Sequence, residues 1–465
     1  MRCTDNWSFG YYRPANLNNT GIYINNIAPR EHTLYIAWYG GAENWSISYR
    51  IKDSRDEWNT YTVSESHAVI DNLLTDTDYE FFVSSAGKKS DVGYARTGFV
   101  PGTVVNYLHP DDRKYSFSGQ HLCTPSILKH PDGYLLAAMD IFDGGAPQNL
   151  TLIFRSDDDG KSWYHLTELF PCFWGTLFMH KGEVYMLATS TEYGDLLIGR
   201  SSDGGKTWGR PTAIARGSSH NVVPGWHKSS MPVIEHKGRL WCAVDYGSHR
   251  SGGHMSCLAS VDASSDILVA DNWTITDPLK YSPEWEGAVK WDDRGFIEGN
   301  AVVAPNGELY NILRYMSDQG VPSHGSVGML KANADEPEKK LEFYKFVTFD
   351  GNLSKFDIKR DEVTGLYFTI FNRLKPGERV GMRNTLSLAY SSDLESWSVL
   401  CDLLDYSHLN YKKVGFQYVS FEFDGNDIIY LSRTAFNGAQ NFHDNNYVTF
   451  HRIEDFRELV KGERL

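Results

Sequence analysis

The chain has 465 residues with 59 acidic and 45 basic side chains, a formal net charge of −14 and an aromatic content of 14%. A protein this acidic is not expected to bind nucleic acid or anionic membranes, because both require a basic face. Apolar residues make up 41% of the chain, too many for a disordered protein, and no apolar run is long enough to predict a membrane-spanning helix.

The N-terminus, residues 1–6, lacks the apolar core of a secretion signal. We therefore expect a cytoplasmic protein, or a secreted one whose leader has been removed. The six cysteines are scattered and form no Cys-x-x-Cys pair, which favours free thiols and argues against zinc held by thiolates. No motif in the sequence predicts a cofactor.

Residues 1–100 are predicted to form a small β-sandwich. Segments 33–38 and 45–50 alternate apolar and polar residues, as half-buried strands do. A leucine pair followed by Tyr79, just before an apolar strand, has the pattern of a tyrosine corner, and Trp38 is the expected buried tryptophan. This stretch resembles a fibronectin type III module, and Pro101-Gly102 marks its predicted boundary.

From about residue 103 onward the sequence repeats. Segments 155–163 and 200–208 share the pattern Ser-x-Asp-x-Gly-x-Ser/Thr-Trp, and 390–397 is a degraded copy. In such a segment Asp and Gly shape a tight turn, and the Trp packs between neighbouring sheets. A second element, two apolar strands joined by a turn, occurs six times. We predict an all-β, six-bladed β-propeller over 103–465, closed by Val104-Val105, although a seventh blade is also compatible with the sequence.

The repeated segments are similar to the Asp-boxes of sialidase-like β-propellers, and the resemblance covers about three quarters of the chain. Segment 297–314 resembles the strand pair that carries a glutamate, here Glu298, and one arginine of that family's carboxylate-binding triad, here Arg314. Arg383 resembles another triad arginine ahead of an Asp-box. Tyr418 matches the nucleophilic tyrosine, and Asp143 lies near the family's acid/base aspartate.

In a propeller, ligands bind at one mouth of the central channel, near residues that precede the inner strands and follow the second strands. The repeat places a polar and aromatic ring there. Its members are His121, Trp174, His227, Lys228, Glu298, Lys355, Gln417 and Tyr418 before the inner strands, and Asp140, Glu192, Asp245, Arg314, Arg373 and Arg433 after the second strands. The polar loop after Arg433, with His443 and Asp444, is also expected to reach the substrate.

One departure from the family bears on the substrate. Sialidases open their propeller with a Phe-Arg-Ile-Pro strand that supplies the first triad arginine, whereas this chain has Cys123 at that position. An arginine trio binds a carboxylate through planar, always-charged donors. His121, Lys228 and Arg433 are the residues considered as sources of the missing charge.

The first hypothesis is exo-acting hydrolysis of a terminal, acidic sugar of a glycan. By the resemblance, Tyr418 attacks the anomeric carbon, Glu298 draws off its proton, and Asp143 protonates the leaving oxygen. The predicted substrate-binding residues are Arg314, Arg383, Arg433, Arg373, Trp174, His227, Lys228, Gln417 and His443.

Two other hypotheses stay open. A polysaccharide lyase acting on uronate linkages, such as rhamnose–glucuronate, needs a neutralising cation and a His or Tyr base. Its candidates are His121, His227, Tyr193 and Arg200. A non-catalytic glycan-binding propeller would instead stack sugar rings on Trp174 and Trp226. The expected partner in every case is a glycan.

Overall fold

A computed structural model describes residues 7, 21–219, 223–289, 295–316, 325–351, 354–378 and 381–463. Nearly all regular structure in these ranges is β-strand; the helices described are η1 (Ala270–Asn272) and α2 (Phe456–Glu463). The expected all-β class is therefore confirmed. Within the described ranges, no helix has the length and apolar character needed to cross a membrane. Cys3 lies outside these ranges, and the five described cysteines are free.

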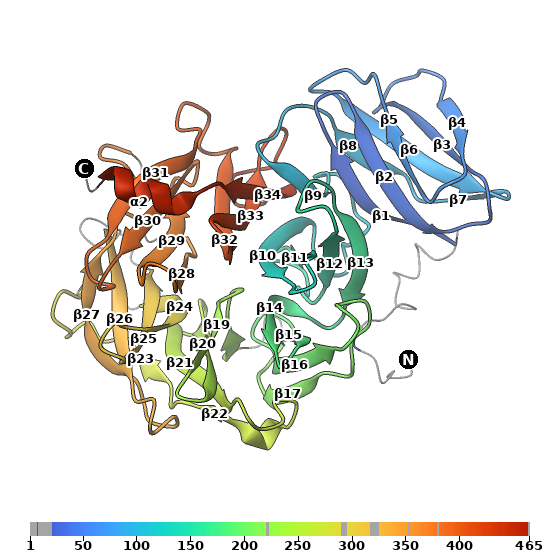
Figure 1. Cartoon of the computed structure of the whole chain (residues 1–465). Helices are drawn as coiled ribbons and strands as arrows, with labels where there is room; N and C mark the ends of the chain where they lie inside the picture. Colours follow the sequence, from blue (N-terminus) through green and yellow to red (C-terminus); the bar gives the residue numbers. More distant parts are fainter. Residues whose placement is uncertain are drawn as a thin grey trace.

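Residues 22–96 form two antiparallel sheets that lie side by side at one edge of the molecule (Figure 1). One sheet holds β1 (Ile22–Pro29), β2 (Leu34–Gly40) and β5 (His67–Ile70); the other holds β3 (Trp45–Ile51), β4 (Asn59–Val63), β6 (Asp78–Ser85), β7 (Lys88–Lys89) and β8 (Gly93–Arg96). Trp38, Ile47 and Phe81 are buried in their shared core. The backbone N–H of Leu74 donates to the hydroxyl of Tyr79 at 2.9 Å, which is the hydrogen bond of a tyrosine corner.

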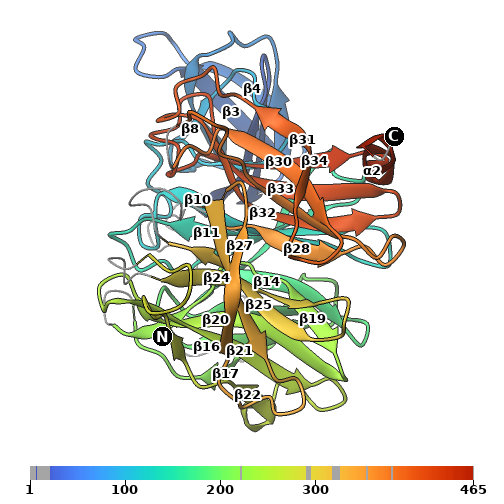
Figure 2. The same ribbon diagram turned by 90° about the vertical axis from the view of Figure 1, so that its left-hand side faces the viewer.

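The remaining described strands form six antiparallel sheets around a common centre (Figures 1 and 2). Sheets 1 and 2 hold β10 (His121–Lys129), β11 (Leu135–Phe142), β12 (Thr151–Ser156) and β13 (Tyr164–Leu169), then β14 (Phe173–His180), β15 (Glu183–Thr189), β16 (Leu196–Ser201) and β17 (Thr212–Ala215). Sheet 3 holds β18 (Gly225–His227), β19 (Val233–His236), β20 (Arg239–Ser248), β21 (Gly253–Asp262), β22 (Trp273–Ile275) and β23 (Leu279–Lys280).

Sheets 4 and 5 hold β24 (Phe296–Val303), β25 (Leu309–Tyr315), β26 (Ser326–Ala332) and β27 (Glu342–Thr348), then β28 (Asp357–Arg360), β29 (Tyr367–Asn372), β30 (Thr385–Ser391) and β31 (Ser398–Asp405). Sheet 6 holds β32 (Gly415–Asp424), β33 (Asp427–Ala435), β34 (Tyr447–Ile453) and β9 (Thr103–Tyr107). Because β9 precedes sheet 1 in sequence but pairs with β34, the first and last segments join in one sheet. The predicted closure by residues 104–105 is thus confirmed.

The three Ser-x-Asp segments form the same hydrogen-bonded turn. In the first, the Asp158 carboxylate accepts from the Ser156 hydroxyl at 2.8 Å and from the backbone of Ser162 at 2.9 Å. In the second, Asp203 accepts from Ser201 and from the backbone of Thr207 at the same distances. The third is similar, with its aspartate accepting from two backbone N–H groups. These turns therefore stabilise sheet edges.

Four inner strands share an irregularity near their start. β10, β14, β24 and β32 each contain a shift in register, and a non-glycine residue there has positive φ. The residues are Thr124 at 37°, Trp174 at 53°, Glu298 at 57° and Tyr418 at 54°. Such bulges redirect a side chain and are common beside functional sites. We call the end of the channel where these strands begin the site end.

Candidate active site

Glu298 and Tyr418, the residues predicted to act at the anomeric carbon, occupy matching bulges in sheets 4 and 6. Positive φ is costly for a side chain of this size, so neighbouring groups must hold it. Asp245, near the end of β20, accepts the backbone N–H of Glu298 at 2.9 Å. In the same way Asp140 of sheet 1 accepts the backbone N–H of Trp174 at 3.0 Å. An aspartate of the preceding sheet thus holds the bulge at Glu298 and the bulge at Trp174.

Arg314 joins the two predicted catalytic residues. Its Nη1 donates to Oε2 of Glu298 at 2.8 Å and to the hydroxyl of Tyr418 at 3.2 Å. The side chains of Arg314 and Glu298 are only 9% and 3% exposed. Burial alone would raise the pKa of Glu298, but Arg314 and His227 favour the charged form, and the pKa lies below its ordinary value. Glu298 is therefore a carboxylate at neutral pH.

Two more guanidinium groups surround Tyr418. The Cζ atoms of Arg433 and Arg383 lie 5.1 and 5.8 Å from the centre of its ring. Burial lowers the pKa of Arg383 to about 10, and Arg314 and Arg433 add to this effect while Tyr418 opposes it. Burial and Glu298 raise the pKa of Tyr418, and the three arginines counteract the rise. One carboxylate and three cations therefore dominate the field at the phenol.

Arg433 lies against Cys123, the residue that stands where the family's first triad arginine is expected. Its Nη1 donates to Sγ of Cys123 at 3.0 Å. Its Nε donates to Oδ1 of Asn445 at 2.8 Å, and its Nη2 to the carbonyl of His443 at 2.5 Å. Arg433 belongs to β33 and Cys123 to β10, so a guanidinium from sheet 6 occupies space next to the start of sheet 1.

His121 and Asp143 lie at the site end of sheet 1, where His121 pairs in register with Phe142. Nε2 of His121 lies 3.9 Å from Oδ2 of Asp444. Burial lowers the pKa of His121, an effect that Asp444 and Asp143 oppose. Asp444 also contacts Nδ1 of His443 at 2.9 Å. Asp143, Asp444 and Arg433 thus all act on His121 electrostatically, and the proton-transfer roles of His121 and Asp143 stay a prediction.

His227 and Trp174 pack together between sheets 2 and 3, with ring centres 4.0 Å apart. His227 acts on Glu298 electrostatically, and its Nδ1 lies 3.5 Å from Oδ2 of Asp245. Trp174 is 5% exposed and Trp226 is 9% exposed. Both are about as buried as Arg314 and Arg383, which are 7% and 8% exposed, so sugar stacking on these rings stays a prediction.

Two predicted substrate-binding residues are directed into the protein instead. Lys228 is fully buried and donates to the carbonyl of Trp174 and the hydroxyl of Thr176, each at 2.9 Å. Burial lowers the pKa of Lys228 to about 8. Gln417 is also fully buried; it accepts from Nη1 of Arg383 and donates to the carbonyl of Phe442 at 2.6 Å. Each supports a neighbour of the site rather than facing the channel.

Two other predicted cations lie away from Tyr418. Arg373 follows the end of β29 and approaches Asp402 on β31, the outermost strand of sheet 5, at 3.5 Å. Arg200 pairs with Glu183 at 3.0 Å, at the end of sheet 2 opposite the bulge of β14. The alternation of side chains explains the first difference, because a shift by one residue reverses the face on which a side chain lies.

Some site residues were missed by sequence reasoning. Asn372, rather than Arg373, reaches the neighbouring sheet, where its Nδ2 donates to the carbonyl of Phe416 at 2.6 Å. Asn445 holds Arg433, and the Asn445-Asn446 pair in a polar loop was the available signal. In the part of the chain that the structure describes, no group of three or more His, Cys, Asp or Glu side chains is arranged to hold a metal ion.

A scan against protein-family models and a search of curated protein sequences both gave no match. Solved structures do match. The α-L-arabinofuranosidase Arb93A of Fusarium graminearum has a TM-score of 0.52 at 13% identity, over 78% of this chain and 100% of that one. The K499G mutant of NanB sialidase from Streptococcus pneumoniae has a TM-score of 0.50 at 9% identity, over 94% and 93%. At these identities the likeness shows the fold alone: an all-β chain built like known β-propellers.

Proposed function

We propose that this chain is an exo-acting glycoside hydrolase that removes a terminal acidic sugar from a glycan. In this proposal residues 103–465 are a six-bladed, sialidase-like propeller, and residues 1–100 are a fibronectin type III-like domain. The observation that carries the proposal is the convergence of Arg314, Arg383 and Arg433 on the Tyr418–Glu298 pair. Guanidinium groups bind carboxylates strongly, and an anionic ligand would relieve the repulsion among three buried cations.

The residues support a retaining mechanism. The oxygen of Tyr418 attacks the anomeric carbon as the glycosidic bond breaks, and Glu298 takes the phenolic proton. The leaving oxygen takes a proton from Asp143, beside His121. Water then attacks the anomeric carbon and gives a proton to the Asp143 carboxylate, while the tyrosyl C–O bond breaks, the phenol oxygen regains its proton from Glu298 and the sugar is released. A neutral phenol suits an acidic sugar because it does not repel the substrate carboxylate.

Two placements favour hydrolysis over the alternatives. Arg200, the cation considered for a uronate lyase, lies at the far end of sheet 2 and pairs with Glu183. Trp174 and Trp226, considered for sugar stacking without catalysis, pack their rings against His227 and Tyr246. The hydrolase proposal, by contrast, uses residues that contact one another.

The test is a screen of glycans that end in sialic acid, other ulosonic acids, rhamnose–glucuronate or neutral sugars. Release of reducing sugar is measured together with the ultraviolet absorbance of an unsaturated uronate. We expect release of an acidic sugar without new absorbance, and loss of that activity in Tyr418→Phe. New absorbance would support the lyase, and full activity in Tyr418→Phe would contradict the proposed nucleophile.

A further inference from the structure

The loop 436–446, between β33 and β34, forms part of the site. His443 and Asn445 accept hydrogen bonds from Nη2 and Nε of Arg433 at 2.5 and 2.8 Å. Asp444 lies 3.9 Å from His121, and the carbonyl of Phe442 accepts from Gln417 at 2.6 Å. These contacts set where the Arg433 guanidinium stands, so the loop acts on the substrate-binding cations through its conformation.

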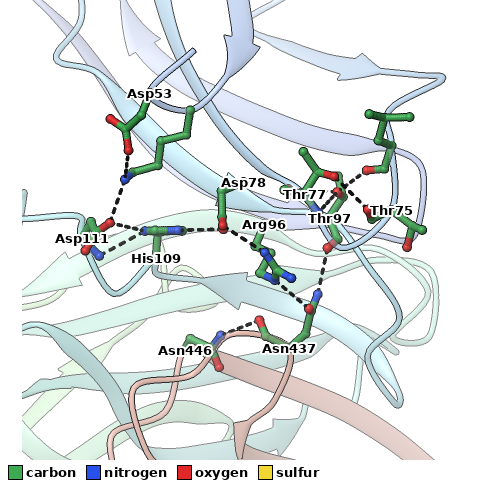
Figure 3. A network of polar contacts seen from close by, with 12 residues as sticks. Asp53, Thr75, Thr77, Asp78, Arg96, Thr97, His109, Asp111, Asn437 and Asn446 are labelled. Atoms are coloured by element: carbon green, nitrogen blue, oxygen red, sulfur yellow. Dashed lines mark hydrogen bonds and ion pairs between the residues drawn. The ribbon is translucent and has the colours of Figure 1, made fainter.

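The opposite half of the same loop contacts the N-terminal sandwich (Figure 3). Nε of Arg96, at the end of β8, donates to Oδ1 of Asn437 at 3.0 Å. Nδ2 of Asn437 donates to the carbonyl of Thr97 at 2.9 Å. Asn446 closes the base of the loop, with its Nδ2 donating to the carbonyl of Phe436 at 2.9 Å and its Oδ1 accepting the Phe436 N–H at 3.2 Å.

Arg96 is held in place by an ion pair within the sandwich. Nη1 of Arg96 pairs with Oδ2 of Asp78 at 2.9 Å, and Oδ1 of Asp78 lies 3.2 Å from Nε2 of His109 (Figure 3). Glycine permits the close approach: a Cβ on Gly98 would lie 2.4 Å from Nδ2 of Asn437, with φ at +134°. Any side chain at Gly98 would therefore push the loop and the sandwich apart.

The hydrophobic core also continues across this boundary. Val104, Tyr107 and Tyr447, from the outer strands of sheet 6, are buried in the same cluster as the sandwich residues Trp38 and Phe81. A shared core makes the sandwich a fixed support rather than a tethered module. The hydrogen bond between Arg96 and Asn437 then fixes the position of the loop relative to the sandwich.

We propose that the N-terminal sandwich stabilises the active site. Arg96 and Asn437 are positioning residues that hold loop 436–446, so that Arg433 meets the acid group of the substrate. The substrate half of this inference rests on the proposed function. The structural half, that the sandwich orders the loop, does not depend on the proposed function.

The test uses the full-length chain with Arg96→Ala and Asn437→Gly. Glycine accepts the positive φ of 38° at position 437, so the second variant removes the side chain without backbone strain. Arg50→Ala is the matched control, because Arg50 is 25% exposed and pairs within the sandwich to Glu80, while Arg96 is 26% exposed. The readouts are amide hydrogen exchange in 436–446, thermal unfolding, and KM and kcat on the acidic substrate found in the glycan screen.

We expect faster exchange in 436–446 and a KM raised about ten- to a hundredfold in both variants, with kcat changed much less. The control should keep wild-type exchange and KM, with an unfolding temperature close to that of Arg96→Ala. Wild-type exchange in both variants would overturn the inference, as would an equal KM rise in the control. If the wild-type chain cleaves no acidic glycan, the proposed function fails, but the exchange comparison still decides whether the sandwich orders the loop.

Discussion

The substitution Glu298→Gln removes one charge from the site and almost no volume. Glu298 is buried, and its Oε2 accepts from Nη1 of Arg314 at 2.8 Å. The amide oxygen of glutamine can accept the same bond, so the variant should fold with the site intact. It can no longer take the proton of Tyr418, and it removes the carboxylate that acts on both Arg314 and Arg383.

The expected magnitudes differ for catalysis, stability and binding. Loss of a general base lowers kcat by about 10²–10⁴-fold. Arg314 then donates to a neutral amide and its buried charge loses its partner, which costs up to about 3–5 kcal/mol of unfolding free energy. Affinity for an acidic sugar should hold or increase, because the substrate carboxylate then meets three cations without Glu298. A fall in kcat combined with retained binding is the distinctive result.

The assay combines steady-state kinetics, calorimetric titration with the released acidic sugar, and urea unfolding. Glu308→Gln is the control, since Glu308 lies in the turn between β24 and β25 and pairs with Lys331 at an exposed position; its kinetics should match the wild type. A Glu298→Gln enzyme with unchanged kcat would refute the assignment of Glu298 as base. Loss of binding in a folded variant would refute the electrostatic reasoning.

Three further outcomes are expected. The pKa of Glu298 is depressed in the folded protein. Its contribution to stability is therefore present above about pH 4.5 and is lost as pH falls through the lower folded value. Urea titrations should show that the unfolding free energy of Glu298→Gln falls less steeply at acidic pH than that of the wild type. Arg433→Ala should raise KM for an acidic substrate about 10–100-fold in steady-state assays while leaving KM for neutral substrates unchanged. Adding Cys123→Arg should restore part of the loss. Equal KM values for Arg433→Ala and the wild type would contradict a role of Arg433 in binding the carboxylate. Asp203→Ala should lower the unfolding free energy by about 1–3 kcal/mol without changing kcat, because three hydrogen bonds to its carboxylate are lost. Unchanged urea midpoints would argue against the turn's structural role.

The all-β class and the closing strand could be predicted because both depend on local patterns. Alternating segments define strands, and a strand–turn–strand element that recurs along the chain implies similar units that stack around a centre. The pairing of β9 with β34 followed from an apolar segment left without a partner before the first repeat. The same repeat brought Glu298, Arg314 and Tyr418 to one end of the channel, where they contact one another.

The details that sequence reasoning missed depend on backbone geometry and on packing. Positive φ at Glu298 and Tyr418 has no sequence signature, since these residue types rarely adopt it. A one-residue register difference separates Asn372, which reaches sheet 6, from Arg373, which points to Asp402. Lys228 was predicted to face the substrate, whereas in the structure its ammonium group donates to the backbone carbonyls of Trp174 and Ser229.

The contact between the sandwich and loop 436–446 could not be predicted from the sequence, for another reason. Arg96 and Asn437 lie 341 positions apart in the chain, and nothing in either local segment signals that they meet. The polar composition of the loop predicted a role near the substrate. The structure shows that the loop contacts Arg433, and its role at the substrate stays a prediction. Which residues anchor the loop from outside is a property of the folded molecule alone.

Two substrates that differ only in the carboxylate show whether the three arginines prepare this site for an acidic sugar. The measurement is kcat/KM of the wild-type chain for an aryl glycoside of the acidic sugar and for its carboxamide. Each charge-assisted hydrogen bond contributes about 1.5–3 kcal/mol, so the account predicts a preference for the acid of at least about a hundredfold. Equal rates, or faster cleavage of the carboxamide, would contradict it.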